Sequence, residues 1–107
     1  MKVFWTRESV KRLNEIEEYI ARNNPDLAIK FIDNLILHTE TLSENSEKGR
    51  VVPEFSIKEI RELLYKKYRI VYLLKKSRIE VLTVFEGHQL LKKEEIEKSI
   101  QLTREHT

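Results

Sequence analysis

Hydrophobic residues recur early in the chain at the three- and four-residue steps of an amphipathic helix. The first such series consists of Val10, Leu13, Ile16 and Ile20. This period predicts a helix over residues 9–23, with Thr6 or Ser9 as its N-terminal cap. The short aromatic and β-branched stretch before it, residues 3–6, predicts a β-strand.

A second apolar series follows the sequence Asn23-Asn24-Pro25. Its members are Ala28, Phe31, Ile32, Leu35, Ile36 and Leu42. The residue before a proline disfavours helical backbone, whereas proline suits the first turn of a helix. The first helix should therefore end before Pro25, and the second should span residues 25–43. A connection this short makes the two helices antiparallel neighbours.

After a polar loop over residues 43–49, short apolar runs alternate with short polar spacers. The runs cover residues 60–64, 68–74 and 79–85. Spacers of this length join only antiparallel neighbours, so the runs predict three consecutive strands of one sheet. The last two runs are apolar at both odd and even positions, and we expect them to have little exposure on either face.

The predicted order is β-α-α-β-β-β, an α+β fold with the helical pair on one face of a mainly antiparallel sheet. Residues 90–102 form a polar, weakly amphipathic helix in which Ile96 and Ile100 are four apart. We expect that helix to have limited contact with the core. The chain then consists of one domain over residues 1–91 and a charged helical tail over residues 92–107.

Composition narrows the class of protein. With 107 residues the chain is long enough for one domain, and the absence of cysteine excludes disulfides, thiolate zinc sites and cysteine nucleophiles. Twenty basic against 18 acidic side chains is too even for binding polyanions by bulk charge. Between residues 48 and 78, however, the sequence contains ten basic residues and only three acidic ones. This excess predicts a basic face on the later strands, opposite the helices, as the ligand surface.

Nothing in the sequence predicts a membrane segment. The longest uninterrupted apolar run is residues 70–74, far short of the roughly 18 residues that a membrane span requires. The charged residues Arg7 and Glu8 follow the N-terminus too closely to leave room for a secretory signal. We expect a cytoplasmic protein.

Metal and cofactor chemistry also lack a sequence signature. His38, His88 and His106 have no helical partner or carboxylate at a metal-binding spacing. With Gly49 and Gly87 as its only glycines, the chain has no phosphate-cradling loop. We expect no metal and no cofactor.

Six segments of the chain together resemble the sequence pattern of a known protein family. They are residues 4–6 (Phe-Trp-Thr), 20–25 (Ile-Ala-Arg-Asn-Asn-Pro), 49–54 (Gly-Arg-Val-Val-Pro-Glu), 60–64 (Ile-Arg-Glu-Leu-Leu), 68–72 (Tyr-Arg-Ile-Val-Tyr) and 79–85 (Ile-Glu-Val-Leu-Thr-Val-Phe). In this order and spacing the chain resembles the RelE/ParE superfamily of bacterial type II toxins, which includes proteins labelled plasmid stabilisation. The resemblance covers about residues 3–91. It implies a small toxin that a co-expressed antitoxin holds inactive by wrapping its C-terminal part around it.

Two activities occur in this superfamily. RelE-like members cut messenger RNA in the ribosomal decoding site, whereas ParE-like members poison DNA gyrase and are not known as nucleases. Metal-free RNA cleavage needs a base, an acid and cations beside the phosphorane. The candidate residues for that chemistry are Glu54 or His88 as base or acid, and Arg50, Arg61 and Arg69 as cations.

The C-terminal end of the resemblance favours the ParE-like branch. Relatives tend to carry a histidine directly after the Val-Phe pair and an arginine three residues later, and here these positions are Glu86 and Gln89. We therefore expect a toxin that inhibits gyrase. A ribosome-dependent endonuclease and a detoxified relative that only binds an antitoxin are the alternatives.

An acidic, amphipathic antitoxin segment should fold onto the basic face and onto an apolar groove beside the helical pair. The candidate residues for binding this partner or the target are Arg50, Arg61, Arg69, Tyr68 and Tyr72. A purely structural role is the alternative for each. The strand arginines would then pair with Glu54 or Glu62, and the tyrosines would be aromatics at the edge of the core.

Overall fold

The computed structural model of the chain describes residues 1–87, 94, 96–98, 100 and 101. Its elements are β1 (Lys2–Trp5), α1 (Arg7–Ala21), α2 (Pro25–Glu40), the 3₁₀ turn η1 (Thr41–Ser43), β2 (Arg50–Val51), β3 (Ile60–Tyr65), β4 (Tyr68–Leu74) and β5 (Arg78–Glu86). The strands form one sheet in the order β1-β5-β4-β3-β2. The β1–β5 pair is parallel and the other pairs are antiparallel. The predicted α+β fold with a mainly antiparallel sheet is confirmed.

Side-chain caps define where both helices begin. Thr6 precedes α1, and its hydroxyl oxygen accepts a hydrogen bond of 3.2 Å from the backbone N–H of Ser9. Asn24 caps α2 in the same way, accepting from the N–H of Leu27 at 3.0 Å, and Pro25 occupies the first turn. Both helices end earlier than predicted. The last predicted turn of the second helix is the 3₁₀ turn η1, a common way for a helix to tighten at its end.

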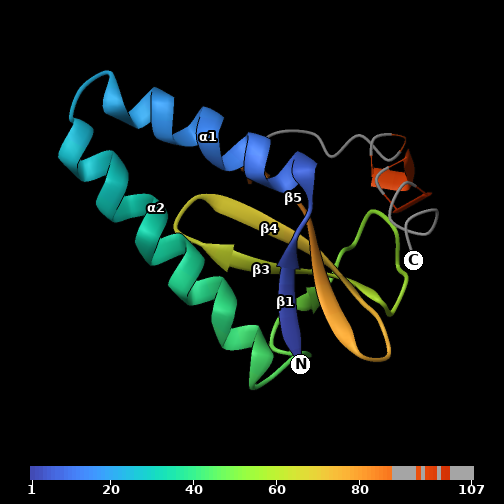
Figure 1. The fold of residues 1–107 in the computed structure, drawn as a ribbon. Coiled ribbons are helices and arrows are strands. Elements are labelled where there is room, and N and C mark those ends of the chain that lie inside the picture. The colour runs from blue at the N-terminus through green and yellow to red at the C-terminus, as the bar shows by residue number, and fades with distance from the viewer. Residues whose placement is uncertain (88–93, 95, 99, 102–107) are drawn as a thin grey trace.

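The helical hairpin covers one face of the sheet (Figure 1). Leu13 of α1 and Leu35 of α2 pack against Ile70 and Tyr72 of β4 and Val81 of β5 in a buried cluster. Because side chains alternate across a strand, the residues between these on β4 must point to the other face. Both central strands are buried almost throughout, as predicted.

The other face of the sheet carries a second hydrophobic cluster. Val71 and Leu73 of β4 pack there with Leu82 of β5 and with Ile96 and Ile100, which lie in helical backbone and are almost fully buried. The expectation that the C-terminal helix has limited contact with the core is therefore wrong for these two residues. Their four-residue spacing puts both side chains on one face of the helix, which the sheet then buries. The expectation that the face opposite the helical pair is a basic ligand surface is also wrong for this part of it.

The strand β2 was not predicted, because two residues are too short to show a period. It pairs with β3 at the edge of the sheet and places Arg50 opposite Glu62. This register is what brings the charged residues of three strands together.

Candidate functional site

Arg69 is the centre of a charged network on the face opposite the helical pair. Its Nη1 and Nη2 donate to the two carboxylate oxygens of Glu54 at 3.0 and 2.9 Å. Its Nε donates to Oε1 of Glu62 at 2.8 Å, and Nη2 donates to the same oxygen. The guanidinium therefore lies between two carboxylates, and its side chain is only 9% exposed. The Phe85 ring packs 5.0 Å from its central carbon.

Glu62 links this arginine to a second one. Its other oxygen, Oε2, accepts from Nε of Arg50 at 2.7 Å and forms an ion pair with Nη2 of Arg50 at 2.7 Å. The Glu62 side chain is fully buried, whereas that of Arg50 is 60% exposed. We call Arg50, Glu54, Glu62 and Arg69 the arginine–glutamate network. It runs from a buried carboxylate outward to one exposed guanidinium.

The network stabilises the charged forms of its members. Hydrogen bonds from Arg69 lower the pKa of the Glu54 carboxyl below its ordinary value, and this outweighs the opposing effect of partial burial. The same hydrogen bonds, with those to Glu62, raise the pKa of Arg69 against the cost of burial. At neutral pH, Glu54 is therefore a carboxylate with reduced basicity, and Arg69 is a cation.

Arg61 lies outside this network. It is in register with Tyr72, whose ring belongs to the cluster under the helices, so its side chain belongs to the opposite face from Arg69. Its Nη1 donates to the carbonyl of Gly49 at 2.9 Å, and its Nε donates to that of Lys58 at 3.2 Å. The predicted single basic face with Arg50, Arg61 and Arg69 is therefore not formed. The structure brings together Arg50, Glu54 and Arg69 and leaves Arg61 apart.

Both candidate tyrosines lie beneath the helical pair. The hydroxyl of Tyr72 donates to the carbonyl of Ser46 at 2.9 Å and accepts from the N–H of Gly49 at 3.0 Å. Tyr68 packs edge-on against Phe31, with the ring centroids 5.7 Å apart. Burial raises the pKa of each tyrosine hydroxyl. Tyr72 is fully buried and fixes the loop before β2, which leaves it no surface for a partner.

Comparison with known proteins shows the family to which the chain belongs. Residues 3–91 match the family model described as the ParE toxin of the type II toxin–antitoxin system parDE. The chain belongs to the ParE toxin family. The resemblance to the RelE/ParE superfamily, and to its ParE-like branch, is thereby confirmed.

One similar protein agrees with this assignment, and one solved structure has a similar fold. The chain is 32% identical over 90 residues to Y4kP of Sinorhizobium fredii, named as a candidate toxin, with 82% of this chain and 90% of that protein covered. Its fold is similar to that in the solved structure of a chromosomal ParDE toxin–antitoxin system from P. aeruginosa. The TM-score is 0.68 at 20% identity, with 80% of this chain and 95% of that chain covered. Membership in a toxin–antitoxin family implies an antitoxin partner.

The central position of Glu62 in the network could not be predicted from the sequence pattern used above. Glu62 pairs with Arg69, as the structural alternative for the strand arginines predicts, and it is in addition the fully buried centre of the network. The available signal was its position: in Ile60-Arg61-Glu62-Leu63, Glu62 falls on the same face as the buried Ile60. A carboxylate at a core-facing strand position is rarely buried unless it is paired.

Acidic residues outside residues 48–78 neutralise part of the basic excess counted there. Glu80 pairs with Lys75 at 3.1 Å and with Arg78 at 2.7 Å, and Glu86 pairs with Lys67 at 3.7 Å. A count of charges over residues 48–78 therefore overestimates the basic character of the sheet in this chain.

The candidate His88 lies outside the described residues. Within the part of the chain that the structure describes, no three His, Cys, Asp or Glu side chains gather closely enough to hold a metal ion. In that same part, no helix is both long and apolar enough to cross a membrane.

Proposed function

We propose that this ParE-family toxin arrests bacterial growth by binding DNA gyrase, does not cut RNA, and is neutralised in the cytoplasm by an antitoxin. The gyrase target comes from the ParE-like resemblance. The non-nucleolytic action is supported by the state of Arg69, which is the observation that carries the proposal.

A cation that stabilises a phosphorane must turn its N–H donors toward the reacting phosphate. The three guanidinium nitrogens of Arg69 already make four hydrogen bonds to Glu54 and Glu62. A guanidinium has five N–H donors, so most of its capacity is used within the chain. Meeting a phosphate would require breaking bonds to a fully buried carboxylate, which is costly.

The candidate base is also poorly suited to cleavage. A general base works best when its pKa is close to the operating pH. Arg69 lowers the pKa of Glu54 instead of raising it. The hydrogen bonds of Arg69 and the lowered pKa of Glu54 are therefore typical of an arginine–carboxylate pair that stabilises the fold. They do not fit a reactive pair that cleaves RNA.

Within the arginine–glutamate network, Arg50 is the residue to which we expect an acidic side chain of the antitoxin to bind. This guanidinium is 60% exposed and is oriented by Glu62, so a partner carboxylate can approach it with little loss of side-chain freedom. The exposed apolar side chains Leu27, Ile29 and Leu37 on α2 support apolar anchors of the same antitoxin segment along the helical pair.

The target is tested by inducing the chain alone in a bacterium. Growth arrest with an SOS response and altered plasmid supercoiling supports the gyrase proposal. Arrest with messages cut at ribosomes would overturn it in favour of the endonuclease. Absence of arrest in a folded chain would overturn it in favour of a detoxified relative that only binds an antitoxin.

The antitoxin contact is tested by charge reversal. Arg50→Glu should raise the dissociation rate of the toxin–antitoxin complex about tenfold or more, because it places like charges together at a point of contact. Lys98→Glu is the matched control, since Lys98 is an exposed cation on the C-terminal helix. Equal effects of the two changes would contradict the assignment of Arg50.

A further inference from the structure

The two backbone groups of Gly49 are held by side chains from two different strands. Its N–H donates to the hydroxyl oxygen of Tyr72 on β4 at 3.0 Å, and its C=O accepts from Nη1 of Arg61 on β3 at 2.9 Å. Gly49 is buried, and a buried backbone group without a hydrogen-bond partner costs free energy. Loss of either side chain should therefore displace Gly49 from its present position.

The space around Gly49 is also restricted. A Cβ atom at this position would lie 2.5 Å from the carbonyl oxygen of Glu62 and 2.5 Å from the hydroxyl oxygen of Tyr72. Within the described part of the chain no glycine has a positive φ, so Gly49 is required for close approach and not for left-handed backbone. The residue that leads into β2 therefore fits tightly against β3 and β4.

Arg61 also binds the segment that follows β2. Its Nε donates to the carbonyl of Lys58 at 3.2 Å, so one guanidinium bridges Gly49, directly before β2, and Lys58, between β2 and β3. Because β2 has only two residues and β3 is its one neighbour among the described strands, the sheet contributes few hydrogen bonds to it. The bridge by Arg61 therefore helps to fix the register of β2.

Arg50 is the first residue of β2 and directly follows Gly49. Its Nε donates to Glu62 at 2.7 Å, while 60% of its side chain remains exposed. Glu62 is itself fixed, because its side chain is fully buried and accepts from Arg69. A shift of the backbone at Gly49 would therefore move Arg50 relative to an acceptor that stays in place.

We propose that Arg61 is a positioning residue, which acts through the Gly49 carbonyl to hold Arg50 where a carboxylate of the antitoxin binds it. The inference rests on the antitoxin contact at Arg50 proposed above and adds the residue that orients it. Direct contact of Arg61 with the antitoxin is the competing explanation, because no ion pair joins Arg61 to a carboxylate of the described residues. The two explanations differ in whether the effect of Arg61 depends on Arg50.

The first test measures, by NMR of the free chain, how fast arginine Nε–H groups exchange with water. A hydrogen-bonded N–H exchanges more slowly than a free one, so Arg61→Gln should accelerate exchange at Nε of Arg50 about two- to fivefold. The Nε–H of Arg69 is the internal control, because it donates to the other oxygen of Glu62 and should be unchanged. General loosening of the fold would accelerate both. An unchanged rate at Arg50, or equal acceleration at both arginines, would overturn the inference.

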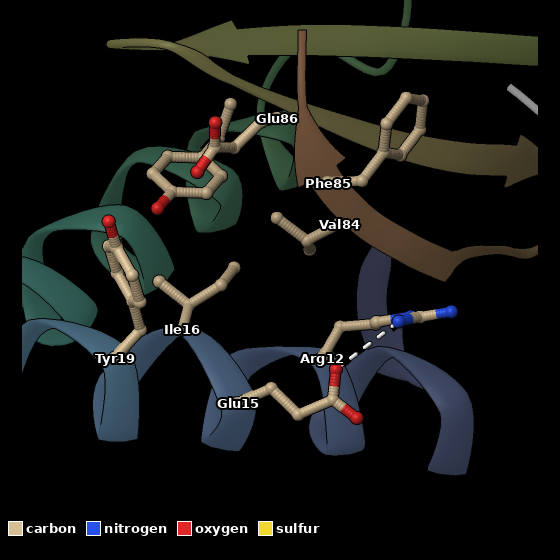
Figure 2. A pocket seen from close by; sticks show the side chains of 8 residues that line it. Arg12, Glu15, Ile16, Tyr19, Val84, Phe85 and Glu86 are labelled. Atoms are coloured by element: carbon tan, nitrogen blue, oxygen red, sulfur yellow. Dashed lines mark hydrogen bonds and ion pairs between the residues drawn. The ribbon is translucent and has the colours of Figure 1, made fainter. Parts of the chain in front are cut away.

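Gly49→Ala is a second variant that displaces the same carbonyl, and it should accelerate exchange at Arg50 as Arg61→Gln does. Arg12→Gln is the matched control. Arg12 is held at 3.2 Å by Glu15 of the same helix, at the wall of a small cavity between α1 and β5 (Figure 2). Its replacement removes the same charge but leaves the hydrogen bonds of Gly49 intact, so the exchange rate at Arg50 should not change.

The second test is a double-mutant cycle on the complex with the protein whose co-expression relieves growth arrest. Arg61→Gln should raise the dissociation rate about two- to fivefold when Arg50 is present, and should have almost no effect in an Arg50→Ala chain. Equal effects in both chains would indicate direct contact by Arg61 and overturn the inference, while the antitoxin contact at Arg50 still stands. If Arg61→Gln alters exchange at Arg50 but Arg50→Ala leaves the dissociation rate unchanged, the positioning of Arg50 is supported and the antitoxin contact proposed for it is wrong.

Discussion

Replacing Glu62 with glutamine should destabilise the fold by about 3–5 kcal/mol, the usual cost of removing one partner from a buried ion pair. Glutamine keeps the size of the side chain and one acceptor oxygen but removes the charge that Arg69 and Arg50 share. Arg69, with a side chain only 9% exposed, is then left with Glu54 as its carboxylate partner. The loss at Arg50 adds little, because an exposed ion pair contributes about 0–1 kcal/mol.

The free energy of unfolding can be measured by urea denaturation, with fluorescence of Trp5 as the signal. Trp5 is the single tryptophan of the chain and packs against the main cluster. In a domain of about this size, each kcal/mol shifts Tm by about 4–8 °C, so Glu62→Gln should lower Tm by at least about 12 °C. Glu54→Gln is the matched control. It makes the same chemical change in a side chain that is 36% exposed, and it should cost about 1 kcal/mol.

A double replacement separates charge burial from simple loss of contacts. Changing Glu62 to Leu and Arg69 to Met together removes both buried charges and fills their space with apolar atoms. Such a change is often neutral or stabilising, so the double variant should be more stable than Glu62→Gln alone. The reasoning fails if Glu62→Gln costs no more than Glu54→Gln, or if the double variant is the least stable of the set.

Three further changes test the fold. A carboxyl whose pKa is lowered on folding stabilises above its unfolded pKa, and this contribution is lost as the pH falls through the folded value. The free energy of unfolding of the wild-type chain should therefore decrease as the pH falls below 4.5, the ordinary pKa of a glutamate such as Glu54. Urea midpoints measured between about pH 6 and pH 3 should decrease less steeply in Glu54→Gln. Tyr72→Phe should cost about 1–3 kcal/mol in urea denaturation, because it leaves a buried backbone N–H without its acceptor, whereas Tyr19→Phe, at an exposed position, should cost almost nothing. Ile96→Ala should cost about 2–3 kcal/mol, with Lys98→Ala close to neutral, and equal thermal midpoints of the two would contradict the packing of the C-terminal helix on the sheet.

Local features of this protein could be predicted from its sequence, because each depends on neighbours a few residues away. The Asn24-Pro25 break separates the helices as expected, since proline restricts the residue before it. The run over residues 68–74 matches β4 at both ends. The four-residue spacing of Ile96 and Ile100 correctly indicated a helix, although it did not show what their shared face would contact.

The candidate site depended on contacts between distant parts of the chain, and only the tertiary structure decided it. Arg61 and Arg69 are eight residues apart, but the turn between β3 and β4 places Arg61 opposite Tyr72 and Arg69 opposite Leu64, on different faces. A count of charges along the chain cannot detect this, because it treats all side chains of a segment as one surface.

The sequence by itself determined the family, the order of the elements other than β2, and the presence of arginines and carboxylates on the later strands. The tertiary structure decided which of these charges pair, because pairing depends on strand register and on burial. Glu62 became the centre of the network when β2 and β4 brought Arg50 and Arg69 to its two oxygens. Arg50 is the cation of that network left exposed, because it lies on β2, the last strand at that edge of the sheet among the described residues.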